Sequence, residues 1–336
     1  MKPTTIKGEI VKEYLSRFPK AAHLTLAKKI QSETGILFDS VDQCRSLIRN
    51  YTGSMGEKGR KQLTDRRFMR TETIDSGENP YELPDSDALD YPIFKIPRAQ
   101  NKILVVSDAH IPYHDNAAMT ATIEWGVEHK VNTILLNGDW IDLYQLSSFV
   151  RDPRKRRFNE EREIFWQVLD VWQNAFPNAV FYYKFANHEA RYEKYLMVKA
   201  PDIFDTEEYR LDVLLRLGER SIIPICDKIR IKAGKLTILH GDEHKGGNAN
   251  LVNPARWLAL KTKGNAMCSH FHKTSSHMTN NINGEMMGCW SIGTMCALSP
   301  EYMPLNDWNA GFARVIVNDD ETFKVTNLII YDGKIQ

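Results

Sequence analysis

Five short apolar segments between residues 103 and 269 end in polar side chains of the same few types, and this feature constrains the fold most. Each segment reads as a β-strand, and each is followed by Asp, Asn or His. In open α/β sheets, functional residues lie beyond the carboxyl ends of the strands. The segments and the letters that follow them are 103–106 with SDAH, 133–136 with NGDWID, 180–185 with ANHE, 236–239 with HGD and 265–269 with HFH.

Segments with helical patterns lie between the first three of these predicted strands. Apolar residues recur at helical spacing over residues 115–129 and 157–174. Strands that alternate with helices predict an α/β core. A lone buried histidine is usually a core residue with satisfied hydrogen bonds, but five strand ends that all supply Asp, Asn or His are hard to ascribe to chance. Oxygen and imidazole nitrogen are the ligands of hard and borderline divalent cations, so the sequence predicts a metal site.

The order of these motifs resembles that of the calcineurin-like metallophosphoesterase family. The family pattern is D-x-H, G-D-x-x-D, G-N-H-[DE], a His before Gly, and G-H-x-H. It appears here, across residues 108–272, as DAH, GDWID, ANHE, HG and SHFH. Ala186 and Ser269 replace two of the family's glycines, so we expect slightly shifted turns without loss of metal. The resemblance implies a sandwich of two mixed β-sheets flanked by helices.

The resemblance also implies two divalent metal ions and their ligands. From the resemblance we expect Mn²⁺ as the bound metal, with Fe, Zn, Ni or Mg as alternatives. One ion would bind Asp108, His110 and His272, the other Asn187, His240 and His270, and Asp139 would bridge both. A hydroxide held between two ions about 3.5–4 Å apart is a nucleophile at neutral pH.

Two further residues receive catalytic roles from the resemblance. His188 would face the leaving group as an acid or charge stabiliser. Asp142 would orient a ligand. His23, His114, His129, His244 and His277 occupy no motif position, so we expect them to be surface or structural residues.

The motifs separate this chain from serine/threonine protein phosphatases. Those enzymes carry arginines in G-D-x-V-D-R-G and R-G-N-H-E, whereas Leu143 and Tyr144 follow Asp142 here, and Phe185 and Ala186 precede Asn187. The chain more closely resembles the metallophosphoesterases of bacteriophages and prophages. That resemblance is carried by GDWIDLYQLSSFVRDPRKRRF, ANHEARYEKYLMVKAPDIF and LSPEYMPLNDWNAGFARVIV.

Basic residues near the motifs bear on the substrate. Arg154, Arg156, Arg157 and Arg191 are candidate contacts to a nucleic-acid backbone, and the alternative is the solvated basic start of a helix. Aromatic residues nearby either stack on bases or pack in the core, namely Trp140, Tyr144, Tyr192 and Tyr195.

The preferred hypothesis is a metal-dependent hydrolase of phosphoesters, acting on nucleic acid as a phosphodiesterase or nuclease. The enzymatic alternative is a phosphomonoesterase or nucleotide phosphatase. The non-catalytic alternative is a DNA- or protein-binding adaptor with a structural metal domain.

The amino-terminal region differs in charge from the rest of the chain. Residues 1–70 hold 15 Lys and Arg against 7 Asp and Glu, although the whole chain carries a net charge of +1. Apolar spacing predicts three short helices within residues 1–55, with Thr25 capping the second and Ser40 and Gln43 opening the third. This pattern fits a DNA-binding helix-turn-helix or a small docking domain. Residues 56–100 are predicted to be a linker that packs on a metallophosphoesterase domain of residues 101–336.

Composition bears on the compartment. No apolar run approaches the roughly 20 residues that span a bilayer, and the first residues lack the apolar core of a signal peptide. We therefore expect a cytoplasmic protein, in the host cytoplasm if it is phage-encoded, without a membrane partner. The five cysteines include no CxxC pair, which predicts reduced and mostly buried thiols. The sequence leaves the oligomeric state open.

Overall fold

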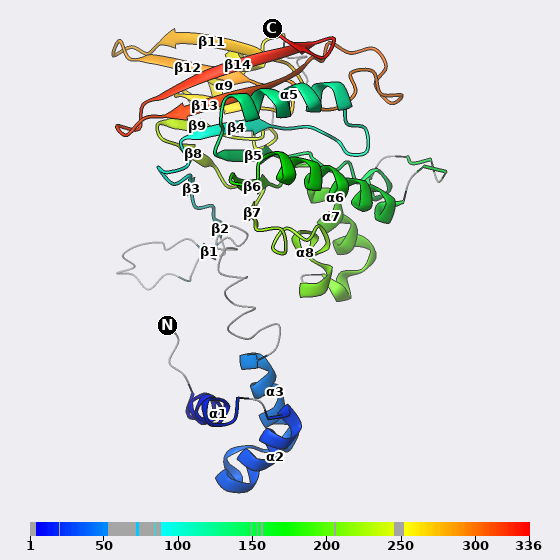
Figure 1. Ribbon diagram of the computed structural model, residues 1–336, viewed down its shortest axis with the longest axis vertical. Coiled ribbons are helices and arrows are strands. Elements are labelled where there is room, and N and C mark those ends of the chain that lie inside the picture. Colours follow the sequence, from blue (N-terminus) through cyan, green and yellow to red (C-terminus); the bar gives the residue numbers. More distant parts are fainter. Residues whose placement is uncertain are drawn as a thin grey trace. The chain divides into compact units, whose positions relative to one another are not determined.

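The computed structural model of the 336-residue chain describes residues 5–19, 21–52, 72–73, 84, 89–148, 150–152, 154–155, 157–204, 206–244 and 252–336. The chain divides into two compact units, residues 1–67 and 68–336. Each unit is described by itself (Figure 1).

The amino-terminal unit contains three helices, as predicted. They are α1 (Ile6–Arg17), α2 (His23–Thr34) and α3 (Val41–Thr52). Apolar residues from each helix form one small core, including Val11, Ile30 and Ile48. The backbone N–H of Gln43 donates to Ser40 Oγ at 3.1 Å, the cap expected for α3. The predicted cap at Thr25 is wrong, because α2 already begins at His23 and Thr25 lies inside it.

A seven-stranded mixed sheet forms the centre of the second unit. Four of its strands are parallel neighbours, and three antiparallel strands extend it at the β4 side. Their order is β15 (Lys334–Ile335), β14 (Phe323–Tyr331), β13 (Ala310–Val317), β4 (Lys102–Val106), β5 (Thr133–Asn137), β6 (Val180–Lys184) and β7 (Ile222–Ile225).

A six-stranded mixed sheet packs against it. The order is β11 (Ser275–Asn280), β12 (Met286–Ser291), β10 (Ala266–Cys268), β9 (Leu236–Ile238), β8 (Ile231–Ala233) and β3 (Phe94–Lys95). The core between the sheets includes Val105 and Leu135 from one sheet and Ile238 and Met267 from the other. β1 (Glu72–Thr73) and β2 (Leu89–Asp90) form a separate antiparallel pair.

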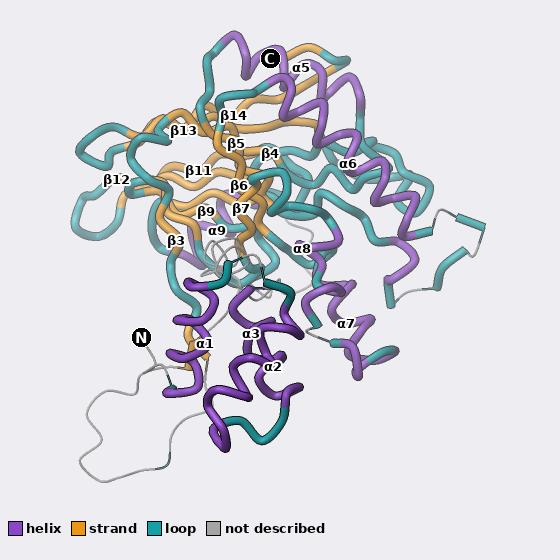
Figure 2. The backbone as a smooth tube through the Cα atoms, turned by 60° about the horizontal axis from the view of Figure 1, so that its bottom comes forward, coloured by secondary structure: helices purple, strands orange, loops and turns teal. Residues whose placement is uncertain are grey.

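Helices cover the outer faces of the two sheets. Residues of α5 (Asn116–Glu128) and α6 (Phe158–Ala175) share a core with Leu104 and Leu136 of the seven-stranded sheet. Figure 2 shows these two helices lying together along one side of the strands. On the other sheet, α9 (Pro254–Thr262) packs on β10, β11 and β12. Two shorter helices follow β6, namely α7 (Ala190–Lys199) and α8 (Leu211–Leu214). The predicted class, two mixed sheets flanked by helices with a helical amino-terminal region, is confirmed.

Short 3₁₀ turns complete the described elements. They are η1 (Gly35–Leu37), η2 (Tyr144–Leu146), η3 (Pro201–Ile203) and η4 (Glu207–Tyr209). Most of the predicted linker, residues 56–71, 74–83 and 85–88, lies outside the described residues. In its described part, Phe94 and Ile96 are buried in the core between the sheets.

Two further predictions concern the cysteines and the absence of a membrane-spanning helix. All five cysteines are free thiols and four of them are buried, as predicted. Among the helices that the structure describes, none is both long enough and apolar enough to cross a bilayer.

Candidate metal centre

The five polar strand ends meet at one place in the second unit. The turn after β4 is tied to the turn after β5, because Asp108 N–H donates to Gly138 O at 3.1 Å and His110 N–H donates to Asp139 O at 3.0 Å. The turn after β10 is tied to the end of β9, because Ser269 N–H donates to His240 O at 2.7 Å. The two sheets therefore present their polar residues to a shared centre.

The backbone is strained where the candidate ligands stand. Asp108, His110, Asp139, His270 and His272 all have positive φ angles, between 45° and 67°. Each such residue costs about 1–3 kcal/mol, and such strain clusters at functional sites. Five of the seven residues predicted as metal ligands therefore adopt a conformation that the local sequence alone would disfavour.

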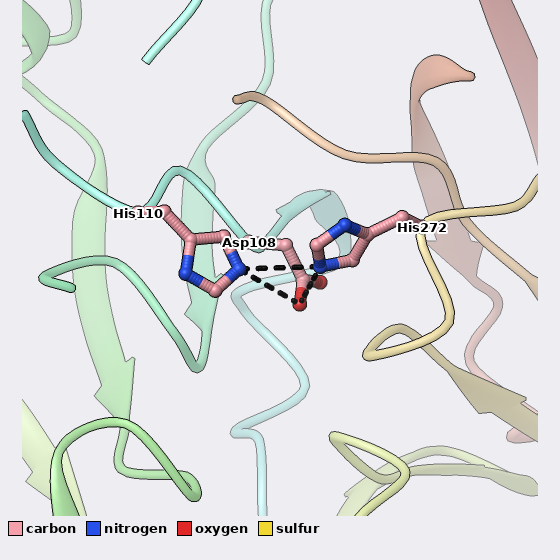
Figure 3. Close-up of side chains that lie close together, drawn as sticks. All are labelled: Asp108, His110 and His272. Carbon is pink, nitrogen blue, oxygen red and sulfur yellow. Dashed lines mark hydrogen bonds and ion pairs between the residues drawn. The ribbon is translucent and has the colours of Figure 1, made fainter. Parts of the chain in front are cut away.

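One group of side chains comes from the ends of β4 and β10. Asp108 Oδ1 lies 3.1 Å from His272 Nε2 and 3.9 Å from His110 Nε2. The two imidazole nitrogens are 3.2 Å apart. Figure 3 shows both rings directed at the Asp108 carboxylate. These three buried residues offer one oxygen and two nitrogens to a single cation.

A second group adjoins the first. Asp139, His240 and His270 place one potential ligand atom each within 4.8 Å of one another. His240 Nε2 lies 3.3 Å from Asp139 Oδ2 and 3.9 Å from Asp108 Oδ1, so it stands between the two groups. The backbone N–H of His270 donates to Asp108 Oδ2 at 3.1 Å.

Buried atoms of the candidate ligands that make no hydrogen bond include Oδ1 of Asn187 and Nε2 of His240, the latter 3.3 Å from Asp139 Oδ2. The other ring nitrogen of His240 lies 2.7 Å from the carbonyl oxygen of Asn137, so this contact leaves Nε2 to face the centre. An uncompensated buried polar atom is costly, and a cation would satisfy both atoms. The donor set of carboxylate, amide oxygen and imidazole therefore fits two divalent cations.

Asp142, His188 and Arg191 form a connected set beside the first group. Asp142 Oδ1 lies 3.3 Å from His110 Nδ1 and 3.1 Å from His188 Nδ1. Arg191 Nη1 donates to the Asp142 carbonyl at 2.7 Å, and Arg191 Nη2 lies 2.9 Å from His188 Nε2. Asp142 thus touches the imidazole of a candidate ligand and that of the candidate acid.

Opposite charges outweigh burial at several of these groups. Burial would raise the pKa of Asp139, but His188 and His240 hold it well below its usual value. Burial lowers the pKa of His272, yet Asp108 more than offsets this and raises the pKa to about 10. At His270, burial and the neighbouring His240 lower the pKa to about 4. A proton on His272 competes with a cation, so metal affinity is expected to fall as the pH falls.

Glu189 supports the turn that carries Asp139, a role that the sequence did not reveal. Its buried carboxylate accepts hydrogen bonds from the backbone N–H groups of Asp139, Trp140 and Ala186 at 3.0–3.1 Å. The Tyr183 hydroxyl donates to it at 2.6 Å. Glu189 is the E of the motif ANHE, so the sequence marks its position. The motif does not show which backbone N–H groups its carboxylate accepts hydrogen bonds from.

Lys184 and Glu243 form a buried ion pair that was also not predicted. The Lys184 ammonium is fully buried, lies 3.0 Å from the Glu243 carboxylate and donates to the carbonyls of Asp227 and Ile229. Glu243 in turn accepts from the backbone N–H groups of His240 and Gly241. Burial alone would raise the pKa of Glu243, but Lys184 and His240 hold it below its usual value. The pair therefore braces the turn that carries His240.

Replacing Lys184 with methionine is expected to lower the free energy of unfolding by about 3–5 kcal/mol, because it leaves the Glu243 charge buried without a partner. Urea unfolding followed by tryptophan fluorescence measures this, since all seven tryptophans lie in the second unit. The Lys184→Met/Glu243→Gln double variant is the control and should recover part of the loss. A loss below about 1 kcal/mol for the single variant would contradict the role of the pair.

The two residues that replace family glycines fit without strain. Neither Ala186 nor Ser269 has a positive φ angle, so neither turn requires glycine. Ser269 Oγ lies 2.9 Å from Ser107 Oγ and accepts from Asn137 Nδ2 at 3.0 Å. Gly138, by contrast, has φ +92°, and a Cβ there would meet Ala186 Cβ and His240 Nδ1 at 2.6 Å.

The predicted substrate-binding arginines lie in different surroundings. Arg191 contacts His188 at the centre, whereas the exposed Arg154 guanidinium binds the Asp152 carboxylate at 2.9 Å. Arg157 is exposed where α6 begins, and Arg156 lies outside the described residues.

Two of the four aromatic residues considered for base stacking pack in the core, which was the alternative left open by the sequence. Trp140 is fully buried against Trp172, and Tyr192 is buried against Phe158. Tyr195 is exposed on α7, and Tyr144 is half-buried. Trp308 contacts the ring of His272 and Phe271 that of His270, and Tyr302 and Tyr113 follow Trp308 in a series of ring contacts that sequence reasoning missed.

No protein-family model matches the chain, and no curated protein matches it. Solved structures that match include a single mutant of Vps29 from Entamoeba histolytica, with 13% identity and a TM-score of 0.36, covering 70% of this chain and 96% of that chain. A dimetal phosphatase from Danio rerio has 9% identity and a TM-score of 0.34, covering 68% and 96%. The phosphoesterase Yfce from E. coli has 11% identity and a TM-score of 0.31, covering 67% and 98%. At this level of similarity, no residue of those proteins defines the role of a residue in this chain.

Proposed function

We propose that this chain is a calcineurin-like metallophosphoesterase of the type found in bacteriophages and prophages, and that it hydrolyses phosphodiesters of nucleic acid with two divalent metal ions. The observation that carries the proposal is the pair of adjoining ligand groups, Asp108 with His110 and His272, and Asp139 with His240 and His270. In three of the five strand turns, those after β4, β5 and β10, candidate ligands have positive φ angles.

The ligand groups divide between two cations. Asp108, His110 and His272 would hold one, and His240 and His270, together with Asn187, would hold the other, with the Asp139 carboxylate shared between them. Two bound divalent cations supply Lewis acidity and a water molecule that ionises near neutral pH. Two ligand carboxylates offset only part of the charge of two such cations, so the centre attracts the anionic phosphate.

The leaving-group side is formed by this chain's own side chains. Asp142 holds the His188 ring at Nδ1, and Nε2, which lies 2.9 Å from Arg191 Nη2, is the ring nitrogen proposed to protonate or stabilise the departing oxygen. Burial lowers the pKa of His188, but Asp139 and Asp142 raise it above its usual value, which favours the protonated, acidic form. Arg191 adds a second positive charge at the same place.

Hydrolysis of bis-p-nitrophenyl phosphate compared with p-nitrophenyl phosphate tests the proposal. With Mn²⁺ the full chain is expected to hydrolyse both and to prefer the diester, and chelation should abolish both reactions. A preference for the monoester would favour the phosphomonoesterase alternative. No hydrolysis with Mn²⁺, Fe²⁺, Zn²⁺, Ni²⁺ or Mg²⁺ would contradict the proposal and favour an adaptor.

The amino-terminal unit is proposed to recruit the nucleic acid. Residues 1–70 carry 15 basic against 7 acidic side chains, and Lys28 and Arg49 are exposed on α2 and α3. Each phosphate that a protein neutralises steepens the salt dependence of affinity by about 0.9 in log–log slope.

Removing residues 1–55 is therefore expected to flatten the salt dependence of DNA affinity and to raise KM on long DNA. Turnover of bis-p-nitrophenyl phosphate should stay the same, because residues 108–272 supply the metal centre. A salt titration of DNA binding for the full and shortened chains measures the slopes. Identical slopes would contradict recruitment and favour a docking role for the unit.

A further inference from the structure

Three aromatic side chains are linked by successive ring contacts that begin at a candidate metal ligand. The ring centroid of Trp308 lies 4.1 Å from that of His272. Tyr302 follows at 6.5 Å from Trp308, and Tyr113 at 6.1 Å from Tyr302. We call Trp308, Tyr302 and Tyr113 the aromatic row. It begins at the metal centre and has no part in the chemistry proposed above.

The row is held in place from both ends. Trp308 and Tyr302 lie in the connection between β12 and β13, which extends to the same side of the sandwich as the connection after β4 (Figure 1). At one end Asn309 N–H donates to His272 O at 2.9 Å, and at the other Ala297 N–H donates to Tyr113 O at 2.8 Å.

The connection is also braced internally. The Asn306 side-chain amide donates to the carbonyls of Leu298 and Met303, and Asn306 Oδ1 accepts from Trp308 N–H at 2.9 Å. A connection without regular structure is thus fixed against the candidate ligands. Pre-organised aromatic side chains bind a flat ligand with little loss of entropy.

Charged side chains lie beside the row. Lys155 lies 5.9 Å from the Tyr113 ring and forms an ion pair with Glu301, the neighbour of Tyr302. Burial raises the pKa of the Tyr302 phenol, as do Cys296 and Asp142, whereas Arg191 lowers it.

The row is accessible, unlike the aromatic residues of the core. Tyr302 is 46% exposed, and Trp308 and Tyr113 are half-buried. By comparison, Trp140 and Trp172 are fully buried. Aromatic faces that stay accessible beside a phosphate-binding centre are the stacking surfaces of proteins that bind single-stranded nucleic acid.

We propose that the aromatic row is a base-binding subsite, in which Tyr302 and Trp308 stack on the nucleobase next to the scissile phosphate. The inference rests on the proposed phosphodiesterase function and narrows its substrate to nucleic-acid ends or single strands, whose bases are unpaired. The row is a specificity-determining element: stacking on a base strengthens binding by about 5–150-fold per base.

The test compares a dinucleoside monophosphate with the same compound lacking one base. For the unaltered, metal-loaded full chain, KM is expected to be about 5–150-fold higher for the abasic compound. Tyr302→Leu and Trp308→Leu should bring the ratio of the two KM values toward one. Tyr302→Phe keeps the ring and should keep the ratio. Tyr331→Leu is the matched control, because Tyr331 is 75% exposed on β14, and it should leave the ratio unchanged.

A binding measurement separates this inference from the proposed function. A dinucleotide with 2-aminopurine loses fluorescence when its base stacks, so stopped-flow quenching reports the subsite before turnover. Quenching that Tyr302→Leu abolishes, without hydrolysis of any phosphodiester, would support the subsite and overturn the proposed function. Hydrolysis with equal KM values for both compounds, without quenching, would overturn the subsite and leave the function standing. Equal effects of Tyr302→Leu and Tyr331→Leu would also overturn it.

Discussion

Replacing Asp139 with asparagine is expected to lower turnover by about 10³-fold or more and to remove at least one metal ion per chain. Asp139 is buried, its Oδ2 lies 3.3 Å from His240 Nε2, and its Oδ1 accepts from the backbone N–H of His188 at 3.0 Å. An asparagine keeps the size of the side chain but loses the charge that would offset two cations. Loss of a single charge-stabilising group already costs about 10²–10³ in turnover, and here the metal would be lost as well.

Elemental analysis and the rate of diester hydrolysis measure this prediction together. Asp319→Asn is the matched control, because Asp319 is exposed in the turn between β13 and β14 and should change neither quantity. Far-ultraviolet circular dichroism shows whether the variant is folded. Two metals per chain with full turnover in Asp139→Asn would contradict the two-metal assignment.

Replacing His188 with alanine is expected to lower turnover by about 10²–10⁴-fold while the metals stay bound, the usual range for a general acid. His188 contacts Asp142 and Arg191 and lies beside Asn187 without belonging to either ligand group proposed here. The loss should shrink for substrates with good leaving groups, because these depart without a proton.

A second variant separates proton transfer from positioning. In His188→Asn the side-chain amide can replace Nδ1 as a donor to the Asp142 carbonyl, which lies 3.0 Å from Nδ1 in the histidine. We expect this variant to lose as much turnover as His188→Ala on a poor leaving group. If both variants lost the same factor on good and poor leaving groups, the acid role of His188 would be wrong.

The strand ends could be predicted because the local apolar pattern and the topology of a parallel sheet both place polar residues there. Apolar runs such as 133–136 fix buried strands, and the Asp, Asn and His letters that follow stand at the carboxyl ends by the geometry of a parallel sheet. The edge strands were harder to predict. β11 alternates half-buried and exposed side chains, and its sequence SSHMTN has no apolar run. Its place in a sheet depends on pairing with β12.

The supporting residues of the site could not be predicted for a different reason. A lysine within the strand YYKF reads as an exposed residue, and nothing near it indicates a carboxylate 59 positions further along the chain. The aromatic row was hidden in the same way, because Trp308 lies in a connection whose contact with His272 exists only in the folded chain. Pairings between distant segments are set by tertiary structure, which local patterns do not encode.

The proposed ligands come from both sheets, with Asp108, Asp139 and Asn187 after strands of one and His240, His270 and His272 after strands of the other. They span more than 160 positions, so an unfolded chain cannot gather them. With metals bound as proposed, mass action couples folding to the free metal concentration: at 100 times the dissociation constant, one ion adds about 2.7 kcal/mol to the free energy of unfolding. The melting temperature should then rise with the free metal concentration, and a chelator should lower it.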